Sequence, residues 1–309
     1  MSANIPRTTL TPSSRAELIG CSPKGVNPVS YIGYYINLDR ATDRRAAMEA
    51  QLTALGPETR YRRFPAVEGN PFGVATSTLT DGELGCFLSH YLLLQMHLDG
   101  AEHLHVIEDD TILASRAPYF LRQAIASRQL ESLDILFTES AITLSLDAWW
   151  EGRREFQSRI DRTEDGAVAD VRFGHVPYVA GTTSYLVNRG SIRLVCDILR
   201  EELEGGATRP IDLLIREKAT EGKLRVQCLF PFITSTGLAD SGSTMSRDDV
   251  TLRSRFALDL LRRSFFVECD PRALFEQADQ QLPSPDMDFR ARLHQRLAAF
   301  IDSDLYRHF

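Results

Sequence analysis

The sequence predicts an α/β fold, with a mainly parallel sheet flanked by helices. Short apolar runs of strand length alternate with helical patterns along most of the chain, and Gly and Pro separate the two kinds of segment. This alternation is typical of a largely parallel sheet with helices on both faces. A chain of 309 residues with 43% hydrophobic residues can also bury the core that such a sheet needs.

The chain becomes regular with a strand and a helix. The run YIGYYINL, residues 31–38, predicts a buried strand. Apolar residues then recur at helical spacing from Met48 to Leu55, before Gly56 and Pro57 end the helix. The further elements expected, in order, are a strand at 61–67, a loop at 68–81, a helix from Leu84 to Leu98, a strand at 104–107, a helix at 118–130 and a strand at 133–138.

The second half is regular only after an interruption. Residues 140–175 hold both tryptophans and a charged stretch, and we expect an insertion or variable loop there. The expected elements beyond it are a strand at 177–187, a helix at 191–203, a short helix after Pro210 and a strand at 224–230. From residue 251 onward the pattern is helical only. We therefore expect an N-terminal tail at 1–28, a catalytic domain at 29–250 and a C-terminal helical extension at 251–309.

Composition narrows the function. With 35 Lys and Arg against 42 Asp and Glu, the formal net charge is -7, which gives no reason to expect a nucleic-acid partner. The five cysteines are scattered singly, without a CxxC pair, which is typical of a reducing compartment. No apolar stretch reaches the length of a membrane span. These features predict a soluble, cytoplasmic protein.

Three adjacent carboxylates follow the strand LHVI. Open α/β sheets place their ligands at the carboxyl ends of strands, where Glu108, Asp109 and Asp110 are expected. Such side chains repel one another unless a hard divalent ion, Mn²⁺ or Mg²⁺, binds between them and a diphosphate. Alternate residues point the same way, so Glu108 and Asp110 are the predicted metal ligands, while Asp109 turns aside. The alternative for an isolated acidic triplet is a solvated turn.

Four collinear segments together carry a family resemblance. They are YYINLDRATDRR, DGELGCFLSHYLLLQMHLDGAEHLHVIEDDTIL, AGTTSYLVNRGSIRLV and RPIDLLI. In this order they resemble glycosyltransferase family 25, over roughly residues 31–243. The resemblance implies a GT-A-like nucleotide-diphospho-sugar transferase fold, a divalent metal and an inverting reaction. It also implies UDP-galactose as a frequent donor, and a saccharide or glycolipid acceptor of a surface glycan such as lipopolysaccharide.

Several residues in these segments are candidates for donor binding. Polar and guanidinium groups at the first strand-to-helix junction could hold a nucleoside and its phosphates, and the small residues near 181 could let the backbone approach a sugar closely. His90 has an equally good alternative as a structural histidine. The predicted donor-binding residues are Asn37, Arg40, Arg44, Ser89, His90, Asp109, Gly181 and Thr182.

An inverting transfer also needs a base for the acceptor hydroxyl. Asp212 is our candidate, because Pro210 suits a first helical position and places Asp212 in the first turn. A helix-terminal carboxylate or a donor-hydroxyl contact is the alternative there. For the whole chain, the alternative to an enzyme is a catalytically silent nucleotide-sugar-binding or scaffold protein.

The extension contains the segment TLRSRFALDLLRRSFF, residues 251–266. Its apolar stripe, which includes Leu260 and Phe265, lies beside the arginines Arg262 and Arg263. One hypothesis is a peripheral contact of these helices with the inner face of an anionic membrane that presents a lipid-linked acceptor. The alternative is that the segment packs on the catalytic domain.

Overall fold

The structure is a computed structural model of the chain. It describes residues 31–56, 61–74, 77–126, 130–140, 172–173, 178–237, 259–260, 262–266, 268–270, 273–274, 276–277 and 280. The expected tail at 1–28, most of the insertion at 140–175 and the first half of the segment 251–266 lie outside these residues.

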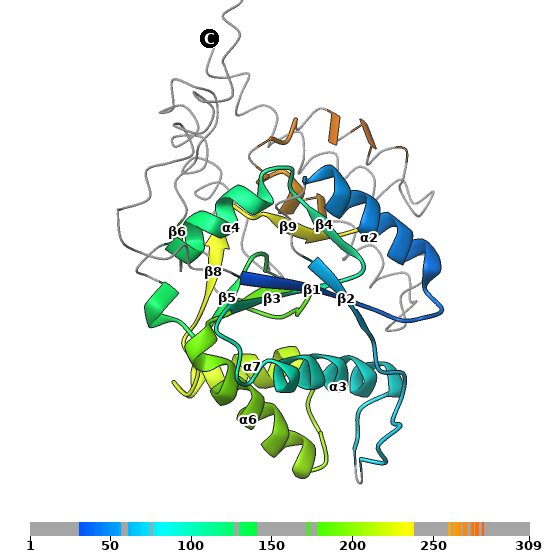
Figure 1. Cartoon of the computed structure of the whole chain (residues 1–309), viewed down its shortest axis with the longest axis vertical. Helices are drawn as coiled ribbons and strands as arrows, with labels where there is room; N and C mark the ends of the chain where they lie inside the picture. Colours follow the sequence, from blue (N-terminus) through cyan, green and yellow to red (C-terminus); the bar gives the residue numbers. More distant parts are fainter. Residues whose placement is uncertain are drawn as a thin grey trace, which may run out of the picture.

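A seven-stranded mixed sheet forms the centre of the molecule (Figure 1). The strand order is β2-β1-β3-β7-β5-β8-β6. The strands are β1 (Tyr31–Asn37), β2 (Tyr61–Pro65), β3 (His103–Glu108), β5 (Ile135–Phe137), β6 (Arg172–Phe173), β7 (Ser184–Val187) and β8 (Val226–Phe230). Both β3 and β5 pair antiparallel with β7, so β1, β2, β3, β5 and β8 share one direction, while β7 and β6 run the other way.

Helices cover both faces of this sheet. Figure 1 shows α3, α6 and α7 on one face, with α2 and α4 on the other. They are α2 (Thr42–Ala54), α3 (Asp81–Met96), α4 (Ala117–Ala126), α6 (Ile192–Glu204) and α7 (Ile211–Thr220), with short 3₁₀ turns at Leu130–Ser132 and Arg189–Ser191. The α/β class with a mostly parallel sheet is therefore confirmed.

Hydrogen bonds and close packing fix the first turns of helix α3. Thr80 and Glu83 form a reciprocal capping box, in which each side chain accepts a hydrogen bond from the other's backbone N–H. Farther along, a Cβ at Gly85 would lie 2.6 Å from the carbonyl oxygen of Val67, so only glycine lets this loop pass so close. The Ser89 hydroxyl links α3 to the same loop, because it accepts a hydrogen bond from Val67 N and donates one to Gly85 O.

Two short strands form a separate two-stranded sheet. The strands β4 (Thr111–Leu113) and β9 (Thr234–Thr236) pair antiparallel, and neither was expected from the sequence. The predicted strand at 177–187 also begins late, at Ser184, because the backbone at Gly181 takes a φ of +97° that leaves the extended conformation. The residues before Ser184 therefore form a loop over the strand ends.

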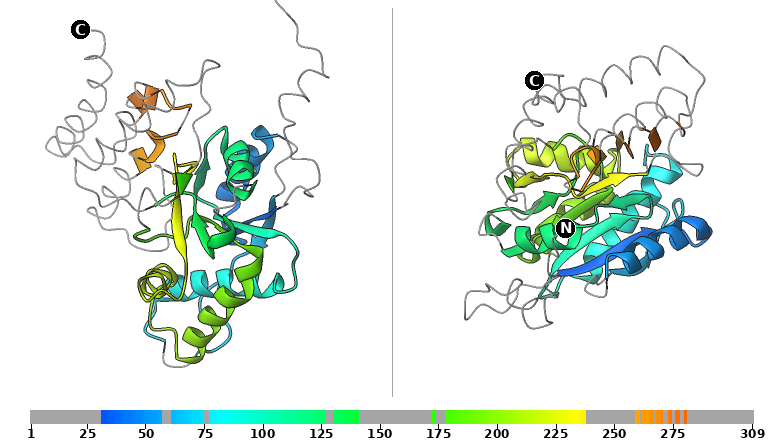
Figure 2. Two further views of the ribbon diagram at one scale, coloured as in Figure 1. Left: turned by 90° about the vertical axis from the view of Figure 1, so that its left-hand side faces the viewer. Right: turned by 90° about the horizontal axis from the view of Figure 1, so that it is seen from above.

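The described part of the C-terminal segment packs on the domain. Leu260, Phe265 and Phe266 are buried, and the two phenylalanines join the main hydrophobic core. Ser235 donates a hydrogen bond of 2.6 Å to Asp259, next to β9, and Figure 2 shows this region from two sides. For these described side chains the alternative, packing on the domain, is what the structure shows, because Leu260, Phe265 and Arg262 face the protein interior.

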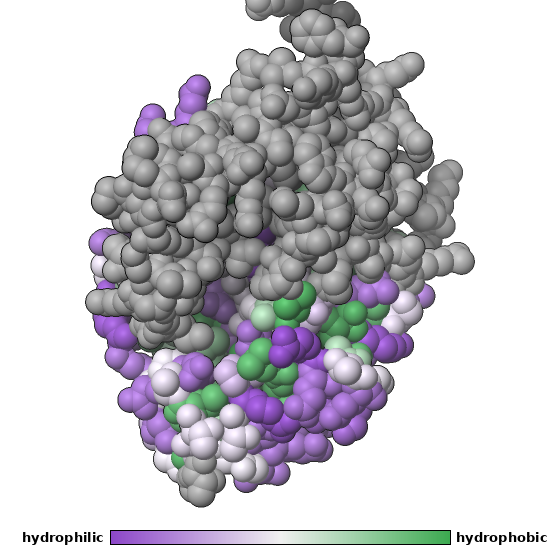
Figure 3. Space-filling view, turned by 180° about the vertical axis from the view of Figure 1, so that it is seen from behind, coloured by the Kyte–Doolittle hydropathy of each residue, from purple (hydrophilic) through white to green (hydrophobic). Residues whose placement is uncertain are grey.

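Two further observations concern the length of the described helices and the character of one face of the molecule. None of the helices in the described ranges is both long enough and apolar enough to cross a bilayer. On the face drawn in Figure 3, hydrophobic patches of the described residues are interspersed with hydrophilic ones.

Candidate active site

The carboxyl ends of the parallel strands meet at one edge of the sheet. Because β1, β3 and β5 share a direction, Asn37, Glu108 and Glu139 emerge at this edge. The reversed strand β7 begins there, so the loop containing Gly181 and Thr182 crosses the same edge. The topology thus gathers polar groups that are far apart in the sequence.

Glu108 lies at the centre of this edge. Its Oε1 accepts a hydrogen bond of 2.9 Å from the Thr182 hydroxyl and lies 3.5 Å from His90 Nε2. Burial alone would raise the pKa of Glu108, but His90, the Thr182 hydroxyl and Arg44 together lower it below its ordinary value. The carboxylate is therefore held ionised. Its side chain remains 30% exposed, so part of it stays accessible to a ligand.

Asp109 turns away from Glu108, as strand alternation predicts. Its carboxylate accepts a 2.6 Å hydrogen bond from the Asn37 amide and lies 3.1 Å from Arg44 Nη1. Arg63 in turn donates to the Asn37 side chain and backbone, at 2.9 and 3.0 Å. Three of the predicted donor-binding residues are thus brought together, and the missed Arg63 holds Asn37 in place.

Asp212 sits in the first turn of α7, as expected. Its Oδ2 accepts a hydrogen bond of 3.2 Å from Gly181 N, and its Oδ1 lies 2.8 Å from Leu213 N. The next residue after Gly181 is Thr182, whose hydroxyl binds Glu108. One short loop therefore links the predicted metal ligand on β3 to the predicted base on α7.

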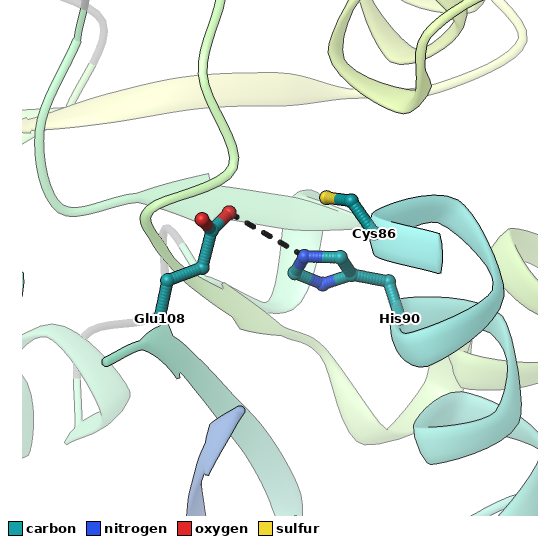
Figure 4. Close-up of side chains that lie close together, drawn as sticks. All are labelled: Cys86, His90 and Glu108. Carbon is teal, nitrogen blue, oxygen red and sulfur yellow. Dashed lines mark ion pairs between the residues drawn. The ribbon is translucent and has the colours of Figure 1, made fainter. Parts of the chain in front are cut away.

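Cys86 and His90 face the same point from α3. They are four residues apart on one side of the helix, and Figure 4 shows both side chains directed at Glu108. Burial raises the pKa of the Cys86 thiol well above its ordinary value, and Glu108, Asp212 and Asp110 raise it further. The side chains of Cys86, His90 and Glu108 thus gather at one point between α3 and the end of β3.

A comparison with protein families decides the identity. Residues 32–215, more than half of the chain, match the model of "Glycosyltransferase family 25 (LPS biosynthesis protein)". The chain belongs to glycosyltransferase family 25. The matched region contains Asn37, the acidic triplet and Asp212, whereas the C-terminal segment with Arg262 lies beyond it.

Individual relatives of the family 25 chain carry the same description, "Glycosyltransferase 25 family member". One from Anopheles gambiae is 29% identical over 185 residues, and one from Aedes aegypti is 32% identical over 138. A third, from Drosophila melanogaster, is 24% identical over 202 residues. These matches cover 52%, 37% and 59% of this chain but only 28%, 22% and 28% of the relatives, which are much longer proteins.

Two other predicted donor-binding residues of the family 25 chain, Ser89 and Arg40, already have partners within the chain. Ser89 is fully buried, and both of its hydrogen bonds join backbone groups of α3 and the preceding loop. Its hydroxyl is thus engaged within the chain, and a role of Ser89 in donor binding stays a prediction. Arg40 forms an exposed ion pair with Glu68. Its guanidinium is thus engaged at the surface, and a role in donor binding stays a prediction.

The sequence analysis missed Glu139. This residue lies two positions after the end of β5, whereas Glu108 is the last residue of β3, and the side chain of Glu139 is 1% exposed. Arg262 Nε lies 2.8 Å from Glu139 Oε2 and donates to the Ser140 carbonyl oxygen, also at 2.8 Å. Burial raises the pKa of Glu139 above its ordinary value, Arg262 lowers it and nearby Glu108 raises it. A strand-end carboxylate was the signal that could have found it.

Proposed function

We propose that this chain is a metal-dependent inverting glycosyltransferase with a GT-A-like fold. It transfers a sugar, galactose by family likelihood, from a nucleoside diphosphate donor such as UDP-galactose to a saccharide or glycolipid acceptor of a surface glycan such as lipopolysaccharide. The proposed compartment is the cytoplasm. Family membership supports the reaction class, and the hydrogen bonds among the strand-end residues support the division of roles among them.

The loop at Gly181 and Thr182 carries the proposal. Gly181 N binds the Asp212 carboxylate while the adjacent Thr182 hydroxyl binds Glu108, so a metal-binding group and a base flank one backbone segment. At Gly181, a Cβ would lie 3.4 Å from Glu139 Oε1, and the φ of +97° disfavours any other residue. A sugar bound against this loop would have the two carboxylates on either side of it.

Glu108 and Asp110 fit a hard divalent ion. Carboxylate oxygens are the donors that Mn²⁺ and Mg²⁺ prefer, and the lowered pKa of Glu108 keeps its carboxylate ionised near neutral pH. When bound, such an ion acts as a Lewis acid that stabilises the negative charge of the departing nucleoside diphosphate. Thr182 orients Glu108 for this role, and Arg44 adds a positive charge at the same edge.

The cluster of Asn37, Arg44 and Asp109 is the part of the site that we propose for the nucleoside and its phosphates. Arg44 is 27% exposed in its side chain, so it can reach a phosphate while its Nη1 stays near Asp109. Asp109 is 7% exposed in its side chain and fixes Asn37 and Arg44 relative to the metal-binding carboxylates. Asp109 thus positions donor-binding groups.

Asp212 is the proposed base. A base takes the acceptor hydroxyl proton as that oxygen attacks C1 from the face opposite the leaving group, and such help is typically worth about 10²- to 10⁴-fold in rate. The hydrogen bond from Gly181 N and the first turn of α7 hold the carboxylate in place. Asp212→Asn keeps the shape but not the basicity. We expect kcat to fall at least about 100-fold while UDP affinity stays near that of the wild type.

Two other results would assign Asp212 differently. A mutant with near-normal kcat at saturating donor and acceptor would remove it as the base. A mutant that binds UDP normally but UDP-sugar weakly in calorimetric titrations would make it a donor-hydroxyl contact instead.

A catalytically silent nucleotide-sugar-binding protein is the second candidate, since the same polar residues could bind a nucleotide sugar without turnover. The two are separated by incubating the full chain with a panel of nucleotide sugars and Mn²⁺, and measuring release of the nucleoside diphosphate with and without saccharide acceptors. A transferase should release it and should form a glycosylated product seen by mass spectrometry. Thermal stabilisation by donors without any release would favour the silent protein.

A further inference from the structure

Three side chains of different chemistry converge beside the proposed catalytic centre. Cys86 Sγ, a ring nitrogen of His90 and a carboxylate oxygen of Glu108 all lie within 4.8 Å of one another (Figure 4). Two of them come from successive turns of α3, at residues 86 and 90, and the third comes from the end of β3. A thiol and an imidazole are borderline-soft ligands, unlike the oxygen donors that Mn²⁺ and Mg²⁺ prefer.

The orientation of His90 is an independent sign of a ligand. The residue is 1% exposed, and its Nε2 makes no hydrogen bond to the described part of the chain, although it points at Glu108 Oε1, 3.5 Å away. Its Nδ1 lies 2.7 Å from the Tyr185 hydroxyl, which can accept the Nδ1 proton. When the Tyr185 hydroxyl accepts the Nδ1 proton, Nε2 can present its lone pair to an ion bound at the cluster, which is the arrangement that a metal-binding histidine adopts.

We propose that Cys86, His90 and Glu108 form a binding site for Zn²⁺ or a similar borderline-soft divalent ion. Zinc sites with three protein ligands and an open fourth position use these donor types. Ligands about 2.0–2.3 Å from a tetrahedral ion lie roughly 3.3–3.8 Å apart, so small side-chain movements close the observed cluster around an ion. Binding replaces the thiol proton of Cys86 by the ion, and the proton passes to solvent.

The position of this site has a regulatory consequence that rests on the proposed function. Glu108 is also a proposed ligand of the catalytic Mn²⁺ or Mg²⁺, so the two ions compete for its carboxylate oxygens. Zinc bound by Cys86 and His90 withdraws Glu108 from the catalytic centre, so Zn²⁺ should inhibit transfer. Replacing Cys86 should remove this inhibition without weakening Mn²⁺ binding, because a thiolate is not a preferred ligand of the harder ion.

Metal binding is tested on the resting full-length chain, without donor or turnover. Zn²⁺ is titrated by calorimetry into the wild type, Cys86→Ser and the control Cys269→Ser, whose cysteine is also half-buried. Since losing even an outer-shell partner costs about 10- to 100-fold in affinity, Cys86→Ser should weaken Zn²⁺ binding at least about tenfold. Cys269→Ser should bind like the wild type, and Co²⁺ should give a thiolate charge-transfer band only when Cys86 is present.

Equal Zn²⁺ affinity in the wild type and Cys86→Ser, or no charge-transfer band with Co²⁺, would overturn the proposal. If Cys86→Ser fails to fold, the wild type still gives an answer. Zn²⁺ should slow alkylation of Cys86 by iodoacetamide, measured by peptide mapping, and an unchanged rate would contradict zinc binding. None of these readouts requires the chain to be a transferase, so a failed zinc site and a failed catalytic assignment are distinguishable.

Discussion

Removal of Arg262 should destabilise the protein severely, because it would leave Glu139 as a buried charge without its cation. The two side chains are 6% and 1% exposed, and Arg262 Nε lies 2.8 Å from Glu139 Oε2. Breaking a buried pair by removing one partner typically costs about 3–5 kcal/mol. We therefore expect Arg262→Met to lower the free energy of unfolding by about that amount at neutral pH.

Urea unfolding followed by circular dichroism provides the measurement. The double variant Glu139→Gln/Arg262→Met carries no charge at either position of this pair, so it should recover at least about 1 kcal/mol relative to Arg262→Met. The matched control is Arg200→Met, whose side chain is 50% exposed and pairs with Asp197 and Glu204 on the surface. Such exposed pairs contribute about 0–1 kcal/mol, so the control should stay close to the wild type.

The pH dependence has a definite sign. Burial raises the pKa of Glu139 in the folded state above its ordinary value, and loss of Arg262 removes the cation that opposes this rise. The folded protein then binds the proton more tightly than the unfolded chain does, so stability is lost as the pH rises through the folded pKa. The deficit of Arg262→Met should therefore shrink as the pH is lowered. A loss below about 1 kcal/mol, independent of pH, would refute the buried pair.

Two further predictions concern helix α3. Thr80→Ala removes the hydroxyl that accepts the hydrogen bond from Glu83 N in the capping box. It should lower the free energy of unfolding by about 1 kcal/mol, measured as a decrease in Tm, while release of nucleoside diphosphate at a permissive temperature stays unchanged. Ser89→Ala leaves Val67 N without its acceptor and should cost about 1–3 kcal/mol, while the UDP affinity measured by calorimetry stays the same. A large loss of UDP affinity with normal stability would instead support Ser89 as a donor-binding residue.

Local sequence patterns predicted the elements that long apolar repeats define. Helix α3 has such a repeat, and β3 is an apolar run that ends in a carboxylate, so both the helix and the position of Glu108 followed from the sequence. Asp212 followed from the helix-start signal at Pro210. The strands β4 and β9 did not, because each has three residues and is defined only by its pairing with the other.

Contacts between distant segments could not be predicted from local patterns. Glu139 and Arg262 are 123 positions apart, and the arginine had the pattern of an amphipathic surface helix. Ser89 was a candidate because it lies in the segment that carries the family resemblance, yet its hydroxyl accepts a hydrogen bond from a loop residue 22 positions earlier. In both cases, the partner of the polar group is distant in the sequence and is brought close only by the tertiary fold.

The central claim is that the strand-end carboxylates form a metal-dependent transfer centre, and Asp110→Asn tests it most directly. The measurement is Mn²⁺-dependent release of UDP from a UDP-sugar, paired with the Mn²⁺-dependent rise in Tm in the presence of UDP. If Asp110 binds the metal, the variant should lose both the release and the Mn²⁺-dependent stabilisation, while its Tm without metal stays near that of the wild type. Normal release by Asp110→Asn would contradict the metal assignment.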